Sequence, residues 1–71
     1  MGELGSFVRQ RRHELGYTLE DVAERTGVSH QAISQIELGN TRELRGSTAV
    51  RLAKALEIDT EELLGRLPAT A

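Results

Sequence analysis

Apolar side chains recur every three or four residues along most of this chain, which is the spacing of one face of an α-helix. Strand-like alternation is absent, and aromatic and β-branched residues are sparse, so helices are expected throughout. The pattern predicts five helices: near residues 4–15, 19–25 and 30–38, then one after Ser47, and a short one opening at Asp59 or Thr60. It therefore predicts an all-α fold with one domain at residues 1–67 and a frayed tail at 68–71.

Residues with strong end preferences mark the predicted helix boundaries. Gly16 and Gly39 follow two of the helices, and glycine enters the left-handed C-cap conformation without strain. Side chains that suit N-caps precede three helices: Thr18, with Asp21 three residues later, then Ser29 and Ser47. Thr26, Gly27 and Val28 are expected to form the short turn between the second and third helices, and Pro68 is expected to end the fifth.

The apolar stripes also predict which side chains are buried. In the second helix we expect Leu19 or Val22 to be buried together with Ala23. Further stripes run along the first, fourth and fifth helices: Leu4, Phe7, Val8 and Leu15; Ala49, Leu52, Ala53 and Leu56; Leu63, Leu64 and Leu67. A 71-residue chain buries only about 60% of its unfolded surface, so good helix packing or a second copy is expected to stabilise it.

Composition excludes several classes of protein. The chain has no cysteine and two histidines, which excludes disulfides and argues against a structural zinc site, so no metal or cofactor is expected. It has no apolar run of membrane-spanning length and no signal-peptide core, so we expect a soluble, cytoplasmic protein without a membrane partner. The net charge is −2, yet residues 30–54 carry four basic and two acidic side chains. This uneven distribution of charge permits a nucleic-acid-binding face on an acidic protein.

The predicted third helix has two chemically different faces. At about 100° per residue, Ile33 and Ile36 fall on one side with Ala32 and Glu37. The other side carries almost only uncharged hydrogen-bonding groups: His30, Gln31, Ser34 and Gln35, with Leu38 at its end. Such side chains read base edges, whereas an ordinary solvated face tends to carry Glu and Lys. Two short helices joined by a glycine-containing turn are typical of a helix-turn-helix.

Four segments in order resemble the Cro and phage-repressor (XRE-type) helix-turn-helix family: GYTLEDVA at 16–23, TGVS at 26–29, ISQIELG at 33–39 and LAKAL at 52–56. The resemblance covers residues 4–64, nearly the whole chain. It implies a lambda-repressor-like five-helix domain that binds double-stranded operator DNA as a homodimer and acts as a transcriptional regulator, most simply a repressor. It also implies that the third helix enters the major groove.

The resemblance implies roles for particular residues. Base contacts are expected from His30, Gln31, Ser34 and Gln35. Phosphate contacts are expected from helix N-termini and the loop after the third helix: Thr18, Ser29, Asn40, Thr41, Arg42 and Arg45. Glu37 matches a position that commonly pairs with an arginine of the first helix, here Arg12, and a structural ion pair is favoured because a carboxylate facing phosphates would repel them.

The chain departs from the family pattern at three points. Leu19 stands where many relatives have Gln, so a contact to phosphate or base is expected to be missing. The loop at residues 40–46 has Leu44, Arg45 and Gly46 in place of the usual Pro-Ser entry to the fourth helix, and Glu43 in it opposes DNA binding. The expected dimer surface is C-terminal, at Leu64, Leu67 and Pro68.

Two other function classes compete with DNA binding. The acidic net charge also suits a protein-interaction module, such as an adaptor or an antitoxin-like binder of a toxin partner. The uncharged face of the third helix and the nearby arginines favour DNA, because an adaptor would more often present an apolar patch there. An enzyme is disfavoured, since no nucleophile–base pair and no glycine-rich phosphate loop are present.

Overall fold

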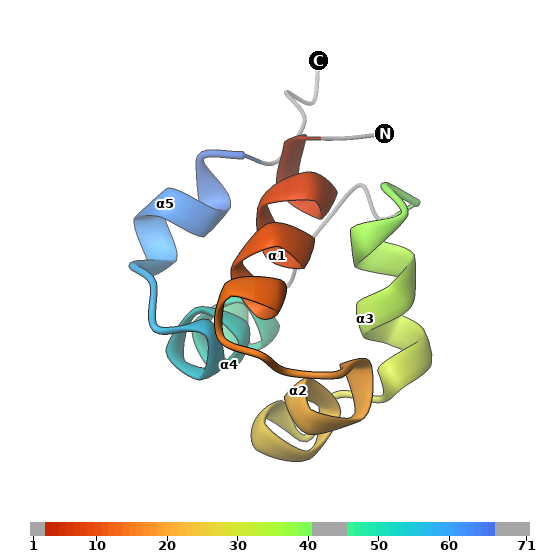
Figure 1. The fold of residues 1–71 in the computed structure, drawn as a ribbon. Helices are drawn as coiled ribbons and strands as arrows, with labels where there is room; N and C mark the ends of the chain where they lie inside the picture. The colour runs from red at the N-terminus through yellow and green to blue at the C-terminus, as the bar shows by residue number, and fades with distance from the viewer. Residues whose placement is uncertain (1–2, 41–45, 67–71) are drawn as a thin grey trace.

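The computed structural model describes residues 3–40 and 46–66, and this part of the chain forms five helices and no strand (Figure 1). The helices are α1 (Glu3–Glu14), α2 (Leu19–Thr26), α3 (His30–Glu37), α4 (Gly46–Leu56) and α5 (Thr60–Leu64). The predicted all-α, five-helix fold is confirmed. Leu67 and Pro68, expected at the end of the fifth helix, lie outside the described residues.

All five helices contribute side chains to a single core. Its largest fully buried members are Val8, Val22, Ile33, Leu52, Leu56 and Leu63. The stripe predicted for the fourth helix is buried at all four positions. In α2 the inward residue is Val22, while Leu19 and Ala23 are half-buried and pack against the edge of the core.

The arrangement of the helices leaves one face of α3 without a neighbour in the described structure. Helices α1 and α3 stand side by side, α2 lies across one end of this pair, and α5 lies on the side of α1 away from α3 (Figure 1). The Arg66 guanidinium stacks 3.8 Å from the Phe7 ring centroid, which holds the segment just after α5 against α1. Arg11 donates from Nε to the Leu56 carbonyl at 2.9 Å and joins α1 to the end of α4.

The predicted turns hold at the two glycines that flank α2. Gly16 and Gly27 have φ of 73° and 75°, a region in which other residues are strained, and the Gly27 N–H donates to the Ala23 carbonyl. Thr26 does not belong to the turn as predicted, because it is the buried last residue of α2. Its hydroxyl donates to the Val22 carbonyl at 2.7 Å and accepts from the Val28 N–H at 3.1 Å. These bonds satisfy the hydrogen-bonding capacity of a buried polar group.

The start of the fifth helix is as predicted, at Asp59 or Thr60, but the predicted N-cap of the fourth helix differs in the structure. Helix α4 begins at Gly46, so Ser47 lies in its first turn, and the prediction that Ser47 caps it is wrong. Asp59 is the N-cap of α5, but its side chain makes no capping hydrogen bond. The third helix ends at Glu37, with Leu38 as C-cap, one residue earlier than expected.

Candidate nucleic-acid interface

The outer face of α3 carries the uncharged polar side chains that the sequence places there. His30, Gln31 and Gln35 are exposed and Ser34 is half-buried, whereas Ile33 and Ile36 belong to the core. Ser29 caps the helix, since its hydroxyl accepts the Ala32 N–H at 3.2 Å. The cap and the buried isoleucines fix the rotation of α3, so its hydrogen-bonding groups face outward.

A shallow hollow of about 490 Å³ lies along this face, and we call it the recognition hollow. Its lining residues come from α2 and α3: Leu19, Ser29, His30, Gln31, Ala32, Ser34 and Gln35. None of them is an acidic residue, a lysine or an arginine. The hollow can therefore accept or donate hydrogen bonds without a strong electrostatic field of its own. On the helical wheel Ala32 falls on the core side, and Leu19 is expected only as a lost contact. In the structure both residues line the hollow.

Gln35 is oriented by a residue beyond the end of α3. The Asn40 side-chain amide donates to Gln35 Oε1 at 2.8 Å, and the Asn40 backbone N–H donates to the Gln35 carbonyl at 3.0 Å. The first bond engages the side-chain acceptor of Gln35 and leaves its amide N–H groups as the donors for a ligand. Asn40 was predicted from the sequence as a phosphate contact, and its hold on Gln35 was not foreseen.

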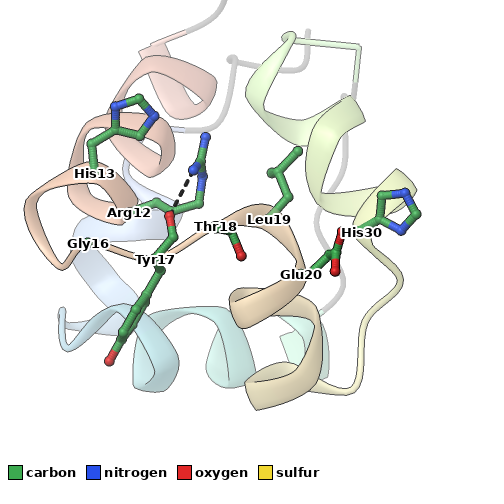
Figure 2. A pocket seen from close by; sticks show the side chains of 8 residues that line it. All are labelled: Arg12, His13, Gly16, Tyr17, Thr18, Leu19, Glu20 and His30. Atoms are coloured by element: carbon green, nitrogen blue, oxygen red, sulfur yellow. Dashed lines mark hydrogen bonds between the residues drawn. The ribbon is translucent and has the colours of Figure 1, made fainter.

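A second hollow, of about 540 Å³, lies where the end of α1 meets the starts of α2 and α3 (Figure 2). Its lining includes Thr18, Leu19, Glu20 and His30. Thr18 is exposed and takes part in a capping box: its hydroxyl accepts the Asp21 N–H at 3.1 Å, and its own N–H donates to Asp21 Oδ2 at 2.8 Å. The box holds the first turn of α2, and with it Leu19, in place.

The capping box predicts a dependence of stability on pH. The Thr18 N–H bond holds the pKa of Asp21 below its ordinary value of 3.8. A lowered folded-state pKa contributes stability above the unfolded-state pKa and loses it as pH falls through the folded-state pKa. The Tm difference between wild type and Asp21→Asn should therefore be largest above about pH 5 and shrink as the pH falls below about 4.

Thermal melts from pH 2 to pH 7 measure this difference. Glu24→Gln is the control, since Glu24 lies on the same helix and its carboxylate makes no hydrogen bond within residues 3–40 and 46–66. A Tm gap for Asp21→Asn that stays constant down to pH 2 would contradict the role given to the carboxylate.

The structure brings Arg12 and Glu37 together at the inner edge of α3. Arg12 donates from Nε to Glu37 Oε2 at 2.7 Å and from a terminal nitrogen to Oε1 at 3.1 Å, so the pair is bidentate. The other terminal nitrogen donates to the Tyr17 carbonyl at 2.9 Å, the bond drawn in Figure 2. The hydrogen bond with Glu37 raises the pKa of Arg12, which keeps the guanidinium charged. One side chain thus joins α1, the loop before α2 and the end of α3.

The other expected site residues fall in two groups. Leu64 is described and is 39% exposed. The remaining residues lie outside the described part of the chain: Thr41, Arg42, Arg45, Leu67 and Pro68. Within residues 3–40 and 46–66 no group of three potential metal ligands occurs, and no helix of this part is long and apolar enough to cross a membrane.

The profile of a family described as helix-turn-helix matches residues 8–63 of this sequence. The chain belongs to the helix-turn-helix family. Its similarity to phage repressors, expected from the four sequence segments, is confirmed by solved structures. The P22 c2 repressor in complex with a synthetic operator superposes with a TM-score of 0.79 at 35% identity, over 84% of this chain and 89% of that one.

Two further groups of proteins are similar to this chain, one in structure and one in sequence. SinR, the master regulator for biofilm formation, was solved in complex with DNA and superposes with a TM-score of 0.80 at 28% identity, over 86% of this chain and 97% of that one. Two HTH-type transcriptional regulators of Mycobacterium tuberculosis, from the strains CDC 1551 / Oshkosh and H37Rv, are each 37% identical over 62 residues, 87% of this chain. The chain spans 44% of the length of these two relatives.

Proposed function

We propose that this domain is a sequence-specific double-stranded DNA-binding regulator, most simply a repressor, that places α3 in the major groove. The observation that carries the proposal is the outward face of α3, whose exposed groups His30, Gln31 and Gln35 are uncharged hydrogen-bonding side chains. A major groove about 12 Å wide admits one helix, and amide and hydroxyl side chains can read its base edges. The P22 c2 repressor and SinR, both solved with DNA, support the same use of this fold.

In this proposal the contacts divide into two kinds. Base edges are read by His30, Gln31, Ser34 and Gln35. Phosphates are held by Thr18, Ser29 and Asn40, with Thr41, Arg42 and Arg45 from outside the described residues. Phosphate contacts fix the register of the helix in the groove, while base contacts specify sequence. Binding to chromosomal operators would place the protein at the nucleoid.

A homodimer on a two-fold operator is part of the proposal. One short helix reads few base pairs, so two half-sites about 34 Å apart are needed for useful specificity. Exposed Leu64 supports an apolar contact between copies at the C-terminal end, together with Leu67 and Pro68. Selection of bound duplexes from a random pool should return a two-fold consensus, and sedimentation of the complex should show two copies per duplex.

Gln31→Ala should weaken binding to the selected operator by about 1–3 kcal/mol and relax the base preference at one position of each half-site. The reason is that an exposed amide at the start of α3 can bond an adenine edge in two places. Fluorescence anisotropy with the consensus and single-base variants measures both effects. Gln10→Ala, an exposed glutamine on α1, is the matched control and should bind like wild type.

The dependence of duplex affinity on salt concentration distinguishes this proposal from the competing function, a protein-interaction module with little DNA binding. Neutralising phosphates makes log Kd change with log salt with a slope of about 0.9 for each phosphate. Arg45→Ala should flatten this slope by about one unit and weaken all duplexes alike. A domain that binds no duplex above background at low salt would overturn the proposed function and favour the interaction module.

A further inference from the structure

We infer that Leu19 makes the domain selective for a pyrimidine C5-methyl group at one position of each operator half-site. This inference rests on the proposed DNA-binding function. It starts from the position of Leu19, which is the first residue of α2 and lines both the recognition hollow and the hollow beside it (Figure 2). An aliphatic side chain is thus part of the surface that holds His30, Gln31 and Ser34.

The side chain of Leu19 is held in place from two sides. Its backbone belongs to the turn fixed by the Thr18–Asp21 capping box. One side of the residue packs against the core, which leaves it half-buried. Figure 2 shows the Leu19 side chain extending from the start of α2 beside α3. A preorganised apolar group loses little conformational entropy when a ligand covers it.

The chemistry of the recognition hollow selects the ligand. Leu19 and Ala32 provide apolar surface, and the remaining lining residues provide amide, hydroxyl and imidazole groups. Leucine can neither donate to a phosphate nor bond a base edge, so a polar DNA atom placed against it would lose hydration without compensation. In the major groove a thymine presents a C5-methyl beside its O4 acceptor, and 5-methylcytosine presents the same methyl beside an amine. The hollow therefore fits a C5-methyl against Leu19 and a polar base edge against α3.

The experiment removes the methyl group and nothing else. Each thymine of the selected operator is replaced in turn by uracil, and Kd is measured for the wild type, Leu19→Ala and Leu19→Gln. Wild type should lose about fourfold in affinity at one thymine per half-site, the value of one buried methyl. Both variants should lose less than about 1.5-fold at that position. A second arm compares cytosine with 5-methylcytosine there, and a gain that depends on Leu19 shows that the methyl itself is recognised.

Controls separate this inference from folding and from the proposed function. Thermal melts establish that each variant is folded at the assay temperature, and Leu19→Gln keeps the length of the side chain if Leu19→Ala is destabilised. Val50→Ala, an exposed apolar residue of α4 that is 52% exposed, should keep the full thymine-to-uracil effect. An equal uracil effect in wild type and both variants, or none in wild type, overturns the inference while leaving operator binding intact. Failure to bind any duplex overturns both.

Discussion

Glu37→Ala should lower the free energy of unfolding by about 3–5 kcal/mol, because it leaves the largely buried Arg12 guanidinium without its carboxylate. The side chains of the pair are 11% and 8% exposed, and the guanidinium is aligned for two parallel bonds to the carboxylate. A small domain has about 5–15 kcal/mol of stability in total, so the variant should be partly unfolded at moderate temperature. Urea denaturation followed by circular dichroism measures the loss.

Two comparisons identify the cause of that loss. Glu14→Ala breaks the Arg11–Glu14 pair, whose side chains are 30% and 51% exposed, and should cost less than about 1 kcal/mol. Replacing both members of the buried pair, as Arg12→Met with Glu37→Leu, should restore most of the stability lost in Glu37→Ala, since no unpaired charge remains. The Tyr17 carbonyl would still lose a donor in that double variant. A Glu37→Ala loss no larger than that of Glu14→Ala would refute the assignment of Glu37 to the scaffold.

The helices and their inward faces could be predicted because their causes are local. A repeat of apolar residues every three or four positions and capping residues such as Thr18 and Ser29 act within one or two turns. The outward face of α3 followed from the same repeat. The boundary at Thr26 differs from the prediction because a β-branched residue beside Gly27 has low helix propensity. Its place in the helix depends on the buried bond from its hydroxyl to the Val22 carbonyl.

Features that depend on how two helices meet could not be predicted in this way. The recognition hollow is lined by Leu19 of α2 and Ala32 of α3. The angle at which these two helices cross cannot be predicted from the sequence of either helix alone. The bond from Asn40 to Gln35 crosses the end of α3, where no periodic rule applies. Gly5 is the clearest case. On a helical wheel it is only a small residue near an apolar stripe, yet its surroundings make it one of the most constrained positions of the fold.

Gly5→Ala should lower the free energy of unfolding by about 1–3 kcal/mol, the usual range for overpacking. A Cβ at this position would lie 2.4 Å from the Glu37 carbonyl oxygen and 2.7 Å from that of Ile36. These are backbone atoms of the last turn of α3, which cannot rotate aside as a side chain can. The change should be unfavourable even though alanine is favoured over glycine in a helix interior by about 1 kcal/mol. Urea denaturation compares the variant with wild type.

Gly46→Ala provides the matched control, since a Cβ at Gly46 meets no atom of residues 3–40 and 46–66 within 4 Å, and the change should stabilise the fold by up to about 1 kcal/mol. Gly5→Ala should also weaken operator binding at temperatures where the variant is fully folded. The reason is that α1 holds Glu37 twice, through its carbonyl against Gly5 and its carboxylate against Arg12. Moving the last turn of α3 away from α1 moves Ser34 and Gln35 with it. Wild-type stability in Gly5→Ala would mean that α1 and α3 can separate at little cost.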